Sequence, residues 1–114
     1  MTPAIEAELT LLPTEQGGRA APLRLEPGSP FYMPHLVIGD PKIKSPAGKL
    51  LGVAFRRAAL DLAPGDTATV RMDLMYHPEV DYRELLPGAT FTVREGPRIV
   101  GHGRVLKRED SGAL

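Results

Sequence analysis

The side chains that could carry chemistry in this chain are few and widely spaced. His35, His77 and His102 form no pair at helical spacing, and the chain has no cysteine. A zinc site would need these histidines to converge with a carboxylate, so surface or hydrogen-bonded histidines are the better interpretation. The absence of cysteine also excludes disulfides, thiol catalysis and thiolate metal sites.

Other catalytic or cofactor patterns are also missing. The acidic residues at 73, 79, 81 and 84 lack the glycine and the regular oxygen spacing of a calcium loop, which favours a solvated face. The only Gly-Lys pair, Gly48-Lys49, has Ile43 where a phosphate-cradling loop needs its first glycine, and Leu50 follows the lysine. None of the three serines lies in a Gly-x-Ser-x-Gly elbow. We therefore predict no catalytic residue, metal, cofactor or bound nucleotide.

Local charge is more informative than the net charge, which is zero. Residues 42–57 carry a net charge of +5, residues 94–108 carry +4, and residues 61–84 carry −4. If the two basic segments share a face, one side of the domain could meet phosphates. The alternative is ordinary interspersed surface charge.

The elements that must position these residues are predicted to be short strands. Apolar residues alternate with polar ones over 5–11, 67–74 and 89–94, which is the period of a half-buried strand. The turn at 95–98 joins the third of these segments to 99–106 in a hairpin. Residues 31–38 are strand-like, with Pro34 at an edge or bulge, and 14–22 form a loop. Residues 50–62 are predicted to be strand, with a one-turn helix as the alternative.

Short antiparallel strands at this spacing predict an all-β barrel or sandwich. The length of 114 residues indicates one domain, which we place at 1–108, with 109–114 as a frayed tail. No apolar run is long enough to span a membrane, and the N-terminus does not resemble a signal peptide. We therefore expect a cytoplasmic protein without membrane contact.

Four motifs, in order, resemble the third, C-terminal β-barrel domain of elongation factor Tu. Glu6-Ala7-Glu8 opens the first strand and is followed by Gly17-Gly18-Arg19, with Pro22 three residues on. Pro30-x-Tyr32 and Pro64-Gly65-Asp66 come next. The most specific motif is the closing hairpin, Phe91-x-Val93-Arg94-Glu95-Gly96-x-Arg98-x-Val100-Gly101-x-Gly103-x-Val105. The resemblance covers nearly the whole chain.

The resemblance implies a six-stranded antiparallel closed β-barrel that does no chemistry. In that family the domain packs against sister domains, grips the T-stem backbone of aminoacyl-tRNA and contacts the exchange partner. It thus implies a translation-related module that binds tRNA or ribosomal RNA. The matching positions are Arg19, Glu95 and Gly96. The basic segments add Arg98, Lys42, Lys44 and Lys49 as nucleic-acid-binding candidates.

The chain departs from the family at several of these positions. Ala20-Ala21 stands where the family usually has His-Thr, and Pro97 replaces the second glycine of the final turn. The segment from Phe31 to Pro64 is about ten residues longer than in the family, as loops tolerate. These departures weaken the expectation of RNA contact.

The alternative function is a protein-interaction module without RNA contact. In the family, two faces of the barrel pack against sister domains. A barrel without those domains must carry polar residues on these faces or cover them with a partner. The candidate anchors are Tyr76, Tyr82, Leu85 and Leu86. These side chains could equally fill the end of the barrel. Gly101 and Gly103 predict a close approach of another strand.

Overall fold

The computed structural model describes residues 3–25, 32–39, 49–55 and 60–109. Lys42, Lys44, Phe31 and residues 110–114 of the predicted tail lie outside the described residues. Glu109, which the prediction placed in the tail, is instead the last residue of a strand that pairs with the N-terminal strand. The elements are β1 (Ala4–Leu11), η1 (Thr14–Gln16), β2 (Leu23–Leu25), β3 (His35–Ile38), β4 (Leu51–Phe55), β5 (Leu60–Leu62), β6 (Thr67–Leu74), β7 (Thr90–Glu95) and β8 (Arg98–Glu109).

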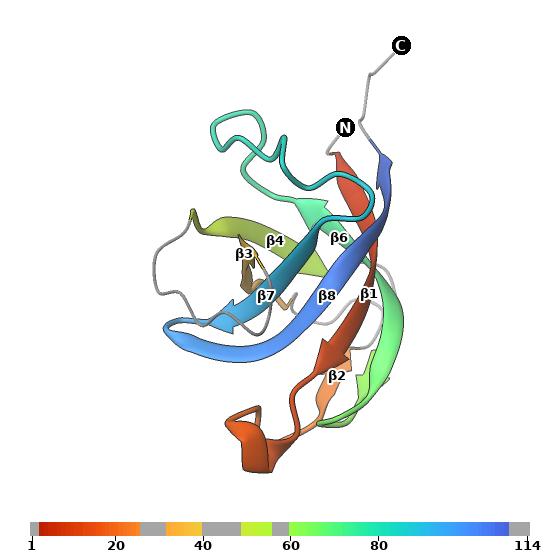
Figure 1. Cartoon of the computed structure of the whole chain (residues 1–114), viewed down its shortest axis with the longest axis vertical. Helices are drawn as coiled ribbons and strands as arrows, with labels where there is room; N and C mark the ends of the chain where they lie inside the picture. Colours follow the sequence, from red (N-terminus) through yellow and green to blue (C-terminus); the bar gives the residue numbers. More distant parts are fainter. Residues whose placement is uncertain (1–2, 26–31, 40–48, 56–59, 110–114) are drawn as a thin grey trace.

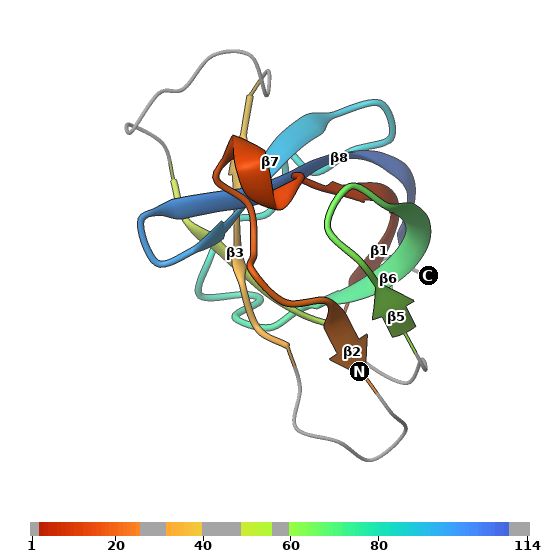
Figure 2. The same cartoon turned by 90° about the horizontal axis from the view of Figure 1, so that it is seen from below.

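Six of the strands close into a barrel in the order β1-β6-β4-β3-β7-β8, with β8 pairing back onto β1. Every neighbouring pair is antiparallel. Figure 1 shows the long strands β8, β1 and β6 wrapping one side of the barrel, and Figure 2 looks into the barrel from below. The predicted six-stranded antiparallel closed barrel is confirmed.

The segments with alternating apolar and polar residues form strands because their apolar residues all point to one side, and that side packs in the core. β6 covers the predicted range, and Val70, Met72 and Leu74 are buried. β1 pairs with β6 in a register that puts Ala7 opposite Val70 and Ile5 opposite Met72. A slip of one residue would turn both apolar sets outward, so the pattern itself specifies the register. The hairpin of β7 and β8 is also confirmed, although β8 runs from 98 to 109 rather than from 99 to 106.

The segment 50–62 lacked a clear period because its first part is buried on both faces. All five residues of β4 are buried, so no polar residue marks an outward side. The prediction of strand is confirmed for β4 and β5, while residues 56–59 lie outside the described ones. β5 leaves the barrel and pairs with β2 in a separate two-stranded sheet that the sequence analysis did not predict.

β3 is shorter than the predicted strand because Pro34 interrupts the pairing. β3 begins at His35, and Tyr32 forms only an isolated bridge with Phe55 on β4. The Pro34 carbonyl still accepts a hydrogen bond from the Val53 amide at 3.1 Å. A proline without an amide hydrogen can accept but not donate, which ends the regular ladder there.

The two glycines of β8 allow β1 to approach closely. A Cβ added at Gly101 would lie 2.7 Å from the Thr10 carbonyl oxygen, and one at Gly103 would overlap the Glu8 carbonyl oxygen. The predicted close approach at both glycines is confirmed. The physical reason is the tight seam where β1 and β8 close the barrel.

Candidate binding groove beside the closing hairpin

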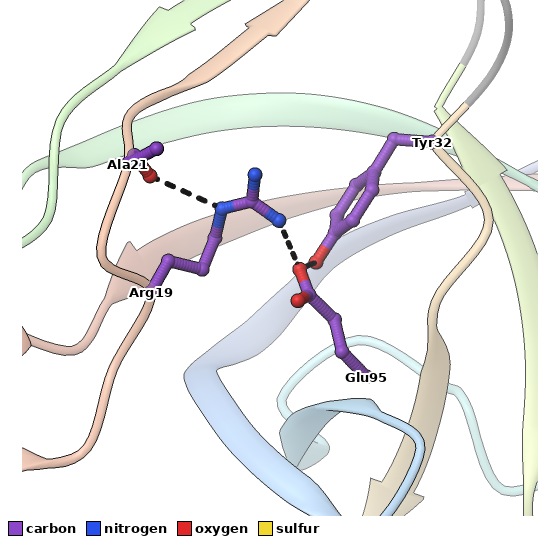
Figure 3. Close-up of polar contacts among 4 residues, drawn as sticks. All are labelled: Arg19, Ala21, Tyr32 and Glu95. Carbon is purple, nitrogen blue, oxygen red and sulfur yellow. Dashed lines mark hydrogen bonds and ion pairs between the residues drawn. The ribbon is translucent and has the colours of Figure 1, made fainter.

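The structure joins two of the predicted site residues, Arg19 and Glu95, in an ion pair. Arg19 follows η1, and Glu95 ends β7, 76 residues further along the chain. The guanidinium Nη1 donates to Glu95 Oε2 while Nε donates to the Ala21 carbonyl oxygen at 3.3 Å (Figure 3). The side chains are 22% and 31% exposed, respectively, so water screens the pair only in part. Arg19 therefore ties the loop after η1 to the closing hairpin.

Tyr32 completes this cluster from the segment before β3. Its hydroxyl donates to the same Oε2 of Glu95 at 2.5 Å, and the Arg19 guanidinium carbon lies 5.5 Å from its ring centroid. Burial raises the pKa of Tyr32 well above its ordinary value, and the hydrogen bond to Glu95 raises it further. The Tyr32 ring also packs edge-on against Phe55, with centroids 5.1 Å apart. Figure 3 shows the side chains of Arg19, Tyr32 and Glu95 converging from separate segments of the chain.

Gly96 lies in the turn that follows Glu95, and Arg98 is the first residue after that turn. Gly96 has a φ of +60°, the left-handed conformation that glycine adopts without steric cost. Arg98 opens β8 directly opposite Glu95 and is exposed. Within the described part of the chain, Arg98 has no hydrogen bond or ion pair. Arg98 is therefore available to an external anion, whereas the charge of Arg19 is already paired.

An open groove of about 620 Å³ lies between the η1 loop and this hairpin. It is lined by Leu12, Gln16, Gly17, Thr92, Pro97, Arg98, Ile99, Gly101 and His102. No acidic side chain is among these lining residues of the described chain. Figure 1 shows the η1 loop below the β7–β8 hairpin.

The η1 loop keeps its shape because of two adjacent glycines. Gly17 has a φ of +88°, and its amide donates to the Thr14 carbonyl oxygen. A Cβ on Gly18 would overlap the Leu12 carbonyl oxygen. Thr14 Oγ1 donates to the carbonyl oxygen of Arg19 at 2.7 Å. The loop is therefore built to hold both the groove wall and Arg19.

Lys49 does not join the Arg19 and Glu95 cluster. It precedes β4, where Leu51 pairs with Leu36 and Gly52 with His35. On its other side, β3 places His35 opposite Arg94, next to Glu95. The chain before Leu51 therefore runs away from the hairpin turn. The charge of Lys49 instead helps to lower the pKa of Asp81, behind the larger effects of the Arg83 hydrogen bonds and charge.

The four predicted protein-interface residues divide into two pairs. Tyr82 and Leu85 are buried, 1% and 0% exposed, so their assignment as surface anchors is corrected. The alternative considered for them, filling the barrel end, fits their position in the core. Tyr76 and Leu86 remain exposed, at 51% and 55%.

Hydrogen bonds explain why the two pairs differ. The Tyr82 hydroxyl donates to the Gly52 carbonyl oxygen at 2.7 Å and accepts from the Tyr76 amide at 3.0 Å, and burial raises its pKa. Arg108 Nη1 donates to the carbonyl oxygens of Tyr82 and Leu85, at 2.8 and 3.2 Å. These bonds satisfy polar groups that would be costly to bury unpaired, so the loop can enter the core.

Sequence reasoning missed Gln16, Thr92 and His102 as groove residues and Tyr32 as a partner of Glu95. His102 alternates with the core-facing glycines of β8, which marks it as outward-facing, but no local pattern shows that the η1 loop lies beside it. Among the described residues, no group of three or more histidine, cysteine or acidic side chains could hold a metal ion. In that same part of the chain, no helix has the length and apolar character needed to cross a membrane. A scan against models of known protein families finds no match.

Proposed function

We propose that this chain is a non-catalytic binding module that holds an RNA backbone, related to the third domain of elongation factor Tu and serving in translation. The observation that carries the proposal is the joining of the Gly17-Gly18-Arg19 loop to the Glu95-Gly96 turn beside an open groove. These are the two segments that the resemblance assigns to tRNA contact. Their proximity is expected if both serve one ligand.

The geometry gives the two arginines different roles. Arg19 is held by Glu95, Ala21 and Tyr32, so its role is to position the loop against the hairpin. Arg98 is exposed and has no partner among the described residues, so it is the better phosphate ligand. Lys49 lies away from this surface and contributes little to it.

The test is the affinity for a short RNA hairpin, such as an unmodified T-stem-loop, measured by fluorescence anisotropy at several salt concentrations. Binding to a backbone predicts affinity that falls steeply with salt. Arg98→Gln should weaken binding to unrelated hairpins by similar factors and reduce the logarithmic salt slope by about 1. The control is Arg83→Gln, which removes the same charge from an exposed residue paired with Asp81 in the loop after β6.

Two results would refute RNA binding. One is no detectable complex at low salt. The other is an equal loss of affinity in Arg98→Gln and Arg83→Gln, which would indicate a general charge effect rather than a surface beside the hairpin.

A second candidate function is protein binding through the loop after β6. It is favoured by the exposure of Tyr76 and Leu86 on a loop that Arg108 and Tyr82 hold in place. Leu86→Ser is the cleaner variant, because the Tyr76 ring covers Gly52. A partner that co-purifies at a fixed ratio with the parent chain and is lost with Leu86→Ser, at unchanged melting temperature, would support this function. A monomeric chain without such a partner would argue against it.

A further inference from the structure

The groove between the η1 loop and the closing hairpin has features that an RNA backbone does not require. A backbone contact needs only exposed cations, whereas this open groove also offers a volume of about 620 Å³. Pockets for small ligands have volumes of this order, roughly 300 to 1,000 Å³. The volume therefore suggests that a compact group enters the groove.

The charge of the lining selects an anion. Arg98 and His102 are the ionisable residues that line the groove, and no acid lines it in the described chain. Neither has a hydrogen-bond or ion-pair partner among the described residues. A guanidinium matches a phosphate group in two parallel hydrogen bonds, and an imidazole can add a third donor. Glu95 lies nearby, but its carboxylate already accepts from Arg19 and Tyr32.

The rest of the lining fits a flat polar ring rather than a bare ion. Leu12, Pro97 and Ile99 offer apolar surface that a free phosphate would not need. The Gln16 amide carries both donors and an acceptor. The Thr92 hydroxyl already accepts a long hydrogen bond from Arg94 Nε, at 3.4 Å, and can still donate one to a ligand. Thr92 is 4% exposed, so its hydroxyl lies in the protected part of the groove. Such groups can recognise the edge of a heterocycle.

We propose that this groove is a binding site for one nucleoside monophosphate unit, which departs from the prediction of no bound nucleotide that the sequence motifs gave. Arg98 and His102 hold the phosphate, and the ring packs on Leu12 and Ile99. The unit could be a free nucleotide or the 5′-phosphorylated end of an RNA. The proposal does not depend on RNA backbone binding, because a free nucleotide would occupy the groove even if no hairpin RNA bound.

The test is a titration of the ¹⁵N-labelled chain with AMP, inorganic phosphate and adenosine, followed by NMR. We expect saturable shifts at the amides of Gly17, Gly101 and His102, with AMP at least about tenfold tighter than either fragment, because two sets of contacts act together. Arg98→Gln should weaken AMP binding by at least about tenfold, as expected for loss of a charge-assisted contact. Arg104→Gln is the control: it removes an exposed arginine from the same strand outside the groove lining and should leave AMP binding unchanged.

A second comparison separates the two sources of the ligand. RNA hairpins with a 5′-phosphate and a 5′-hydroxyl are compared for competition with AMP. Preferential competition by the phosphorylated end identifies RNA ends as ligands, and equal weak competition identifies the free nucleotide. The proposal is overturned if AMP binds no better than phosphate, or if Arg98→Gln and Arg104→Gln affect AMP equally. Failure of hairpin binding alone refutes the RNA function and leaves this site intact.

Discussion

The closure of the barrel predicts that Gly103 cannot carry even a methyl group. A Cβ there would overlap the Glu8 carbonyl oxygen and would lie 2.7 Å from Phe91 Cζ and 3.0 Å from Phe91 Cε1. Glu8 belongs to β1, which is hydrogen-bonded to β6 on one side and to β8 on the other. Its carbonyl therefore cannot move without disturbing two ladders. Phe91 is fully buried, so its ring has little room to move away.

The cost of Gly103→Ala follows from these contacts. Overpacking a filled core usually costs 1 to 3 kcal/mol, and a backbone atom as one of the obstacles places this site at the upper end, about 3 kcal/mol. For a domain of this size, that corresponds to a fall of about 10 °C in melting temperature. Gly103→Val should be worse, because the added methyl groups approach the same atoms.

The measurement is urea unfolding followed by circular dichroism, since the chain has no tryptophan to report on its core. Gly96→Ala is the matched control, because its Cβ would meet nothing within 4 Å although its φ is +60°. Backbone strain alone should cost that variant about 1 kcal/mol. The double variant Gly103→Ala with Phe91→Leu should recover part of the loss, since the ring atoms are removed but Glu8 remains. If Gly103→Ala costs no more than Gly96→Ala, the account of the barrel seam is wrong.

Four further substitutions test contacts outside the seam. Arg19→Gln and Glu95→Gln should each destabilise the chain, and a double-mutant cycle should give a coupling of about 1 kcal/mol, well outside the 0.3 to 0.5 kcal/mol expected of independent sites. Arg108→Met should lower the free energy of unfolding in urea by about 2 kcal/mol, because the carbonyl oxygen of Tyr82 loses a charged donor. A cost near zero would mean that water replaces the guanidinium. Because burial raises the pKa of Tyr32, its contribution to stability is present below pH 10 and is lost as the pH rises above that value. Tyr32→Phe should therefore flatten the alkaline decline in the free energy of unfolding, and an unchanged slope between pH 9 and 11 would contradict that assignment.

The strands could be predicted wherever one face of the segment meets water. β1 and β6 show regular alternation because their outward residues are polar, and the turn residues 95–98 mark the hairpin of β7 and β8. β4 gave no such signal because both of its faces are buried, so its residues carry no period. β2 has three residues, too short for a period to be visible, and its pairing with β5 depends on where the barrel places both segments.

The candidate site was predictable only in part. Arg19, Glu95 and Gly96 were identified through their resemblance to a known domain, but their joining through an ion pair was not. For Tyr82 and Leu85, the sequence allowed either an exposed interface residue or a side chain that fills the end of the barrel. The hydrogen bonds from Arg108 to their carbonyl oxygens explain why this loop can be buried. His102 was considered a lone histidine until the η1 loop was found beside it.

The amino-acid order alone determined which segments extend, where the chain turns and which strand needs glycine. These are properties of a few neighbouring residues, set by backbone sterics and by the contrast between apolar and polar side chains. Which loops meet around the groove, and whether an arginine faces solvent or a carboxylate, was decided only when β8 closed against β1. Arg19 and Glu95 are 76 residues apart, and no local rule connects groups at that separation before the barrel brings them together.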